Sequence, residues 1–459
     1  MQNRLLLAAV IASACATSAW ASNLDLTASY NIRGLSYSNL NLNSADKNNH
    51  SFVSNDARLG FAVRKIYLES RGGEDTTMDV TVSLHALGVA GSTVPLVAPF
   101  NKAAENYPRT DFAPFLENAN ISVHQLFGLP METTFGRQNF KLGSGLVLDD
   151  DGAGFTGITA RAALPWWDVH VQGFIFSGRE SFFSQNYLGL YGGTIELPSE
   201  GTWQLNQLFE RDRANQTVYG CNYPGMPPEG CVISQARKSF TSVRYQINYG
   251  PMVFDGEAAL ERGVGTPTFN GNGSTPLGTH IVYSGDAEVV RAKWKQSFYR
   301  MGEGIARVSV GRGSGDDPGS PTKDEAFFPS HGHRFDGLER SGFGDFFGAS
   351  PYDAFGGNYS TSTASGLRKG ASGIVAVGGG FTPPSYKGII LDVDYYLYQA
   401  ERVDHGSRTL GGEWDIHLRY AIEDRFTLSA SAALFGIGSA SNVNLGKAKK
   451  YTVQASGRF

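Results

Sequence analysis

Residues 451–459 read YTVQASGRF, and two kinds of side chain alternate along this stretch. Successive side chains of an extended strand point to opposite faces of a sheet. One face therefore carries apolar or small residues and the other carries polar ones: Tyr451, Val453, Ala455, Gly457 and Phe459 against Thr452, Gln454, Ser456 and Arg458. The stretch predicts a strand with one apolar and one polar face.

The same alternation recurs along the chain, often for about ten residues at a time. About seventeen segments show it, and residues 186–209 leave room for one or two more. The clearest are 24–37, 58–71, 78–86, 243–249, 254–261, 289–298, 305–312, 389–398, 412–420 and 426–432. This number of strands predicts an all-β protein.

The composition of the 459 residues agrees with a chain of strands and turns. Glycine is abundant, with 57 residues, and 12 % of the residues are aromatic, which excludes a disordered chain. After residue 21 the chain has no apolar run long enough for a helical membrane span. The 39 basic and 43 acidic residues give a net charge of −4. Without a concentrated basic face, we expect no nucleic-acid partner.

Short turns and long polar connections link the predicted strands. Tyr249–Pro251 and Ile422–Arg425 are short turns, whereas Gly88–Ala113 and Gly313–Lys369 are long connections. Short turns at one end, long loops at the other and aromatic residues near strand ends are typical of outer-membrane barrels, and lipid requires such a sheet to close. We expect a transmembrane antiparallel β-barrel of about 16–18 strands, with short periplasmic turns and long extracellular loops. A soluble β-sandwich is the alternative.

Residues 1–21, MQNRLLLAAVIASACATSAWA, have the features of a cleaved signal peptide. Arg4 precedes an apolar stretch, and Ala19-Trp20-Ala21 has a small residue at both cleavage positions. We therefore expect export through the periplasm to the bacterial outer membrane, with a single barrel domain over residues 22–459. The expected partners are the barrel-assembly machinery, outer-membrane lipid and lipopolysaccharide.

The exported chain keeps two cysteines, Cys221 and Cys231, in a stretch rich in glycine and proline. An oxidising compartment favours a disulfide between them. A metal site is the alternative, but no histidine lies nearby to complete it.

The polar faces of the predicted strands would line a water-filled lumen. Alternation places charges of both signs there: Arg244, Arg291, Lys293, Lys295, Arg307, Asp392, Asp394, Glu413, Asp415 and Arg419. Arg291, Lys293 and Lys295 share one face of one strand, so they would form a line of cations that guides anionic solutes. The alternative is that these charges pair across strands and brace the barrel.

Arg137 has no settled face, because Phe135 shares its side of the strand. Two positions are open to it: the membrane interface, or the pore if a local bulge turns it inward. The longest connection, Gly313–Lys369, contains SPTKDEAFFPSHGHRFDGLERSGFGDFF and is too aromatic for a disordered loop. We expect this connection either to fold into the lumen or to lie over the mouth of the barrel.

Two groups of residues contain side chains that can bind metal ions, but neither has the spacing of a known metal-binding motif. Asp149-Asp150-Asp151-Gly152 lacks the distal glutamate of an EF-hand, so we expect a solvated turn. We expect His331 and His333, near Asp336, to lie in a loop held by ordinary hydrogen bonds. The chain has no C-x-x-C-H haem motif and no recognisable catalytic motif. We expect no metal, no cofactor and no enzymatic activity.

Several patches of the chain resemble the alginate export family of outer-membrane barrels and its porin-like relatives. They are Gly136-Arg137-Gln138 with the Gly-rich loop that follows, Phe328-Pro329-Ser330-His331-Gly332-His333 with GLERSGFGD after it, Leu410-Gly411-Gly412-Glu413-Trp414-Asp415, and the final strand ending in Phe459. The resemblance implies an eighteen-stranded barrel that passes an anionic polysaccharide, or a relative that passes other small solutes.

The sequence thus predicts a channel through which hydrophilic solutes diffuse, with an anionic oligo- or polysaccharide as the favoured cargo. A general porin for small metabolites is the alternative, because the predicted lumen charges are mixed. An outer-membrane hydrolase and a sheath around a partner subunit are the less favoured classes.

Overall fold

In the computed structural model the described residues are 23–39, 49–71, 74–90, 111–164, 168–177, 188–212, 216–217, 231–269, 280–300, 302–317, 320, 323–333, 335–336, 339–340, 342–347, 371–403, 405–423, 425–439 and 447–459. The predicted signal peptide, Cys221 and the side chain of Cys231 lie outside this set. The cleavage site and the disulfide therefore stay predictions.

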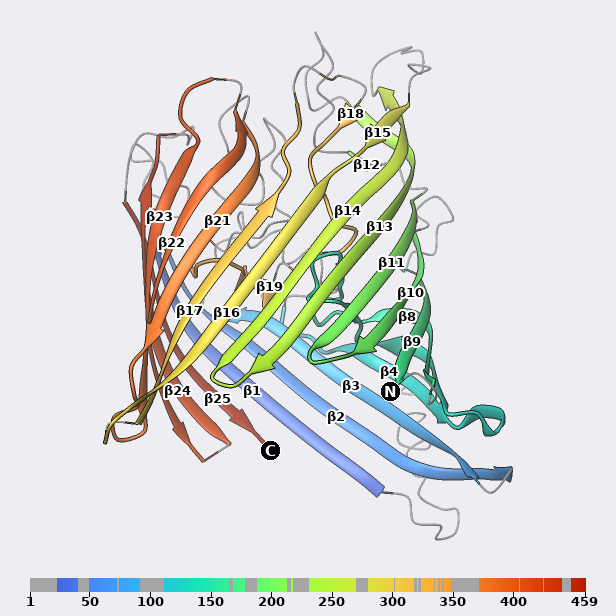
Figure 1. The fold of residues 1–459 in the computed structure, drawn as a ribbon. Helices are drawn as coiled ribbons and strands as arrows, with labels where there is room; N and C mark the ends of the chain where they lie inside the picture. Colours follow the sequence, from blue (N-terminus) through green and yellow to red (C-terminus); the bar gives the residue numbers. More distant parts are fainter. Residues whose placement is uncertain are drawn as a thin grey trace.

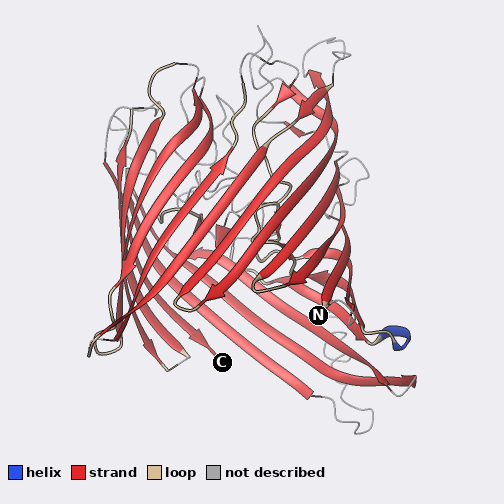
Figure 2. Cartoon of the chain, viewed as in Figure 1, coloured by secondary structure: helices blue, strands red, loops and turns tan. Residues whose placement is uncertain are grey.

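Eighteen long strands in the described part of the chain form one antiparallel sheet that closes into a barrel (Figures 1 and 2). Each long strand pairs with the long strands before and after it in the chain, and β1 pairs with β25 to close the sheet. The long strands are β1 (Asn23–Ser38), β2 (His50–Arg71), β3 (Glu74–Ala90), β4 (Phe115–His124), β5 (Met131–Gln138), β8 (Phe155–Leu164), β9 (Val169–Ser177), β10 (Leu188–Pro198), β11 (Thr202–Asp212), β13 (Cys231–Tyr249), β14 (Met252–Phe269), β16 (Asp286–Phe298), β17 (Gly302–Gly313), β21 (Ala371–Thr382), β22 (Ile389–Val403), β23 (Thr409–Ile422), β24 (Phe426–Ile437) and β25 (Lys447–Arg458).

Short elements extend the wall or lie in the connections. The closed sheet also contains β12 (Gln216–Thr217), β15 (Ile281–Tyr283) and β18 (Lys323–Asp324), of which β15 and β18 pair in parallel. Two small two-stranded sheets and one 3-10 turn complete the described elements: β6 (Lys141–Leu142) with β7 (Leu148–Asp149), β19 (Phe335–Asp336) with β20 (Glu339–Arg340), and η1 (Leu126–Gly128). The prediction of a barrel is confirmed, and its wall has eighteen long strands, the higher of the two expected numbers. Residues 186–209, whose strand content was ambiguous in the sequence, hold β10 and most of β11.

The outer face of the wall is apolar. On β11, Trp203, Leu205 and Phe209 are exposed on the outside, whereas Asn206 and Leu208 between them are buried on the inside. The other long strands show the same division, and the closed antiparallel sheet pairs neighbouring strands all around the wall, as a lipid environment requires. Among the described residues, no helix has the length and apolar character needed to cross a bilayer.

The two ends of the barrel differ in the length of their connections. Short turns follow β10, β13, β16 and β23, for example the one between Tyr249 and Met252, and the C-terminal end of β25 lies at the same end (Figure 1). The connections that follow β3, β11 and β17 are long and lie at the other end. Short turns mark the periplasmic end of such barrels, so we call this the short-turn end.

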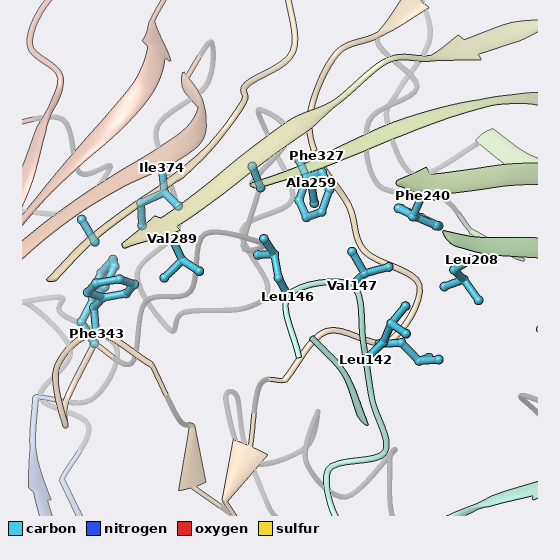
Figure 3. Close-up of a cluster of buried hydrophobic side chains, with 14 of the residues drawn as sticks. Leu142, Leu146, Val147, Leu208, Phe240, Ala259, Val289, Phe327, Phe343 and Ile374 are labelled. Atoms are coloured by element: carbon cyan, nitrogen blue, oxygen red, sulfur yellow. The ribbon is translucent and has the colours of Figure 1, made fainter. Parts of the chain in front are cut away.

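Two connections fold into the barrel instead of standing outside it. We call residues 139–154, between β5 and β8, the first inner segment. The described residues within 314–347, between β17 and β21, form the second inner segment. Both contribute buried side chains to one apolar cluster with the inner wall (Figure 3), including Leu142, Leu146, Val147, Phe327 and Phe343 from the segments and Leu208, Phe240, Ala259, Val289 and Ile374 from the wall. Of the two positions open to the longest connection, its described part therefore occupies the lumen.

Candidate functional site

Wall charges hold the tip of the first inner segment through its main chain. The carboxylate of Glu257, on β14, accepts hydrogen bonds from the Ser144 N–H at 2.6 Å and the Ser242 hydroxyl at 2.8 Å. Arg244, on β13, donates to the Gly143 carbonyl at 2.8 Å. Gly143 has φ +60°, and an added Cβ would lie 2.5 Å from Oε1 of Glu257. Only glycine fits this close approach.

The second inner segment is fastened in the same way at two places. Glu261, on β14, accepts the Phe328 N–H at 2.7 Å and pairs with Lys238 at 2.8 Å. Glu413, on β23, accepts the N–H groups of Phe346 at 2.5 Å and Phe347 at 3.0 Å. Next to it, Asp415 accepts the Asp345 N–H at 3.0 Å, so consecutive N–H groups of the segment end on wall carboxylates.

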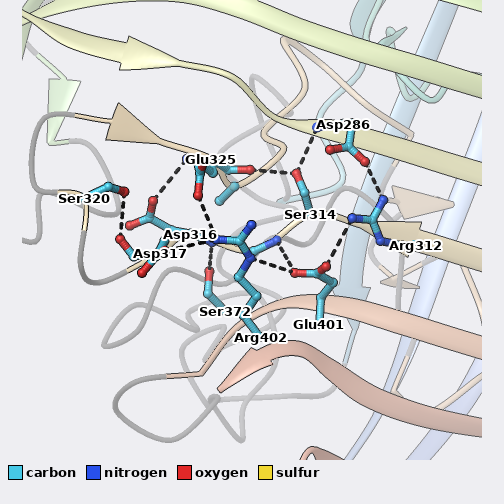
Figure 4. Close-up of polar contacts among 12 residues, drawn as sticks. Asp286, Arg312, Ser314, Asp316, Asp317, Ser320, Glu325, Ser372, Glu401 and Arg402 are labelled. Carbon is cyan, nitrogen blue, oxygen red and sulfur yellow. Dashed lines mark hydrogen bonds and ion pairs between the residues drawn. The ribbon is translucent and has the colours of Figure 1, made fainter. Parts of the chain in front are cut away.

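A third group of contacts fastens the start of the second inner segment near the long-loop end (Figure 4). Glu401 accepts the Gly315 N–H at 2.9 Å and pairs with Arg312 at 3.1 Å. Arg402 pairs with Glu325 at 2.7 Å. The Ser372 hydroxyl accepts the Asp316 N–H at 2.8 Å. Acidic residues of the wall therefore serve largely to fasten the inner segments.

The two inner segments also meet each other. Leu148 and His331 form a parallel bridge, and the His333 N–H donates to the Gly145 carbonyl at 2.8 Å. Nδ1 of His333 lies 2.7 Å from Asp151 and 3.4 Å from Asp149. These three side chains could hold a metal ion, but the ammonium of Lys141 lies 2.9 Å from the same Asp149 oxygen. We therefore interpret the cluster as an ion-pair junction, formed by two motifs that are 182 residues apart in sequence.

We predict that this junction weakens as the pH rises. Burial lowers the pKa of His333, but its hydrogen bond to Asp151 and the charges of Asp151 and Asp149 raise it by more, so the pKa lies above its usual range. Protonated His333 stabilises the junction, because its pKa is higher in the folded protein than the value of about 6.5 in an unfolded chain. The stabilisation is complete below about pH 6.5 and is lost as the pH rises through the folded-state pKa. Limited proteolysis of the segments should be faster at pH 9 than at pH 6, and His333→Gln should remove that difference. Equal rates for the wild type at both pH values would contradict it.

An open cavity of about 1030 Å³ lies in the lumen between the inner segments and the short-turn end. The inner faces of β1, β2, β16, β17 and β21 to β25 surround it. Its charged lining residues are Arg33, Arg58, Lys293, Arg307, Arg419, Arg425 and Arg458 against Asp56, Glu303, Asp392 and Asp394, with His417 beside them. The described lining therefore carries seven cations against four carboxylates.

Part of this lining is internally neutral. Arg307 binds Asp394 with two parallel contacts, at 2.6 and 2.7 Å, and reaches Asp392 at 3.2 Å. Arg419 lies 4.0 Å from the other oxygen of Asp392. Two arginines and two aspartates thus balance each other, which agrees with the bracing interpretation for these four residues.

Other cations of the cavity have no such balance. Within the described residues, Lys293, Arg425 and Arg458 have no carboxylate within 4.0 Å, and Glu303 is the single acidic lining residue without an ion pair. A smaller recess of about 150 Å³ continues from Lys293 past Arg291 to Phe343 of the second inner segment. Positive charge in a confined, low-dielectric space raises the local concentration of anions, so the cavity can attract and hold a carboxylate.

The structure distributes the residues expected to line the pore over several environments. Lys293, Arg307, Asp392, Asp394 and Arg419 line the large cavity, and Arg291 lines the smaller recess. Lys295 is exposed on β16 but borders neither space. Arg244 pairs with Asp255 at 2.8 Å under the first inner segment.

Glu413 and Asp415 differ from the expectation that they line the pore, and Arg137 does not occupy the pore position that was one of the two open to it. Glu413 and Asp415 do face inward, but the second inner segment covers them, leaving 0 % and 1 % of each residue exposed. Arg137 donates to the Ala153 carbonyl at 2.6 Å, where the first inner segment ends, and does not border the cavity. Alternation shows which side of the wall a residue faces but not what covers it, and this is the reason for the difference.

Sequence reasoning missed part of the cavity lining. Arg33 and Arg58 lie on the polar faces of β1 and β2, and Arg458 on that of β25, so alternation alone places them inside the barrel. Arg425 lies in a short turn, where no periodicity is present to indicate its direction.

No family model matches the chain, and no curated protein matches it by sequence. Among solved structures, OccK9 (OpdG) of Pseudomonas aeruginosa is similar at 12 % identity and a TM-score of 0.53, over 95 % of this chain and 98 % of that one. OccAB4 of Acinetobacter baumannii is similar at 10 % identity and a TM-score of 0.51, with the same coverage.

A third similar structure is the outer membrane protein opdK from Pseudomonas aeruginosa, at 12 % identity and a TM-score of 0.45, over 95 % of this chain and 98 % of that one. The OccK9 and OccAB4 structures support a porin-like barrel fold, and neither supports membership of the alginate export family. With its closed sheet and apolar outer face, the chain has the fold of the porin barrels and lies in the outer membrane of a Gram-negative cell.

Proposed function

We propose that the protein is a non-enzymatic channel through which small anionic solutes, above all carboxylates, diffuse across the outer membrane. The observation that carries the proposal is the uneven charge of the open cavity, where seven cations face four carboxylates. Arginine and lysine bind carboxylates through charge-assisted hydrogen bonds. Several such groups along one path allow an anion to pass from one to the next.

The fastening of the inner segments explains how mixed lumen charges produce a positive cavity. Glu257, Glu261, Glu413 and Asp415 accept main-chain N–H groups of the segments. All four residues are buried, so their carboxylates are shielded from the water-filled space. The cations that remain in the open cavity set its electrostatic character, which favours an anion path over the general porin for small metabolites.

Passage of an anionic oligo- or polysaccharide, which the resemblance to the alginate export family implies, is a narrower form of the same proposal. The cations would bind the uronate carboxylates of such a chain as they bind a small carboxylate. The inner segments favour small solutes, because they occupy part of the lumen that a polymer would have to traverse.

The test is the reversal potential of the purified protein in a planar bilayer under a KCl gradient. We expect a clear anion preference and a current reduced by millimolar monocarboxylates or dicarboxylates. If oligouronates reduce the current at much lower concentrations than monomeric uronates do, the result would support passage of an anionic polysaccharide. A cation preference, or an unselective current indifferent to carboxylates, would overturn the proposal.

A further inference from the structure

Three arginines lie close together on the outer face of the barrel, toward its long-loop end. Arg211 of β11 is directly opposite Arg237 of β13. Arg262 of β14 is opposite Ser239, two residues from Arg237 along β13. All three are exposed. We call Arg211, Arg237 and Arg262 the outer arginine cluster.

The direction of these side chains follows from their neighbours. Asp212 and Glu261 are buried on the inner side of the wall, next in sequence to Arg211 and Arg262. Phe209, Leu260 and Val264, two residues away on the same strands, are exposed apolar residues of the outer face. Because side chains alternate between faces, the outer arginine cluster projects away from the lumen. It therefore takes no part in the channel proposed above.

The cluster has no anionic partner in the described part of the chain. Arg262 donates to the carbonyls of Glu261 at 2.6 Å and Gly285 at 3.2 Å, and within the described residues it forms no ion pair with a carboxylate. No carboxylate lies within 4.0 Å of Arg211 or Arg237 among the described residues. Like charges directly opposite each other destabilise a sheet. An anion from outside the chain would relieve this repulsion.

The depth of the cluster fits the outer boundary of the membrane. Trp203 and Tyr245, paired across β11 and β13, lie with their ring centroids 4.4 Å apart near the short-turn end. Arg211 and Arg237 are paired eight residues further along the same two strands. At about 3.3 Å per residue and a strand tilt near 40°, this is roughly 20 Å along the membrane normal. The apolar band of such barrels is about 25 Å tall, so the backbone of the cluster lies about 5 Å short of its outer edge, and the long arginine side chains can extend from there to the headgroups of the outer leaflet.

We infer that the outer arginine cluster binds the phosphate groups of an outer-leaflet glycolipid, that is, the phosphorylated sugar moiety of lipopolysaccharide. The planar guanidinium group binds phosphate with two parallel hydrogen bonds. Just toward the membrane centre, Phe209 stacks on Tyr191 at 5.3 Å, and this aromatic pair offers an apolar surface for the acyl chains. The outer arginine cluster at the headgroup level and the aromatic pair nearer the membrane centre together match an amphipathic lipid that carries phosphate.

The test compares binding of two glycolipids to the folded protein in detergent. We expect the wild type to bind bisphosphorylated lipid A at least about tenfold more tightly than dephosphorylated lipid A, as measured by native mass spectrometry. Arg211→Gln combined with Arg237→Gln should reduce this preference to about twofold or less. The matched control combines Arg300→Gln with Lys387→Gln, which removes two exposed cations from turns at the short-turn end. It should keep the wild-type preference.

Three outcomes would overturn the inference. The first is equal binding of both glycolipids by the wild type. The second is an unchanged preference in the double variant, with its folding verified by heat-modifiable migration on a gel. The third is an equal loss of the preference for bisphosphorylated lipid A in the double variant and in its control. That result would show that binding depends on the net charge of the protein and not on the outer arginine cluster. Arg237→Lys keeps the charge but loses the two parallel hydrogen bonds, so its preference should lie between those of the wild type and the double variant.

Discussion

Replacing Glu413 with alanine is expected to release the second inner segment from the wall and to raise single-channel conductance several-fold. The Glu413 carboxylate accepts the N–H groups of Phe346 and Phe347 and the Tyr398 hydroxyl at 3.1 Å. A buried donor left without a partner costs about 1–3 kcal/mol. The Tyr398 hydroxyl keeps the Phe343 carbonyl as a partner at 3.0 Å, so the substitution leaves two N–H donors without a partner and destabilises the docked position by about 2 kcal/mol or more. Conductance in planar bilayers would measure the release.

Two further variants make this prediction specific. Gly344→Ala leaves every charge in place, but Gly344 has φ +79° and its new Cβ would lie 2.0 Å from the Tyr398 oxygen. It should therefore raise conductance as Glu413→Ala does. Glu200→Ala removes an exposed carboxylate from the turn between β10 and β11 and should change nothing. Wild-type conductance in folded Glu413→Ala and Gly344→Ala would show that the segment does not restrict the current.

The second large effect is expected from removing the unbalanced cations of the cavity. Lys293→Gln, Arg425→Gln and Arg458→Gln together remove three positive charges, which is the whole excess of seven cations over four carboxylates. Because the field in a confined lumen follows its net fixed charge, the reversal potential under a KCl gradient should fall close to zero. An unchanged reversal potential would show that the conducting path does not pass through this cavity.

Arg307→Gln tests the same electrostatics at a paired position. Arg307 binds Asp394 and reaches Asp392, so its removal leaves these carboxylates without this partner and deletes one cation. Because the net charge of the cavity falls by one in each case, we expect this substitution to lower the anion preference about as much as any one of the three unbalanced substitutions does. The pair Arg300→Gln and Lys387→Gln, located in the turns, is again the neutral comparison.

The barrel could be predicted from the sequence because alternation has one physical cause along the whole wall. Every wall residue faces either lipid or the lumen, and residues such as Trp414 and Asp415 must differ accordingly. The same rule places Arg307, Asp392 and Asp394 inside. The strand number was harder to predict, since residues 186–209 contain the glycine-rich β10, whose alternation is weak.

The inner segments could not be predicted, because irregular chain has no period. Leu142 and Leu148 lie in a connection that could equally face water, and nothing in their spacing indicates the apolar inner wall that covers them. For this reason Glu413 and Asp415 were expected in the open pore, although the segment buries them. The contact between Asp151 and His333 depends on both segments folding inward, so neither motif could indicate the other.

The wall recognises the inner segments chiefly through their main chain, and this has an evolutionary consequence. Ser144, Phe328, Phe346 and Phe347 present N–H groups to wall carboxylates, and every residue except proline can supply that group. Exposed side chains of the segments can therefore mutate while the attachment persists. A lineage carrying this barrel can diversify the substances it admits by point substitution, without redesigning the scaffold that holds the constriction.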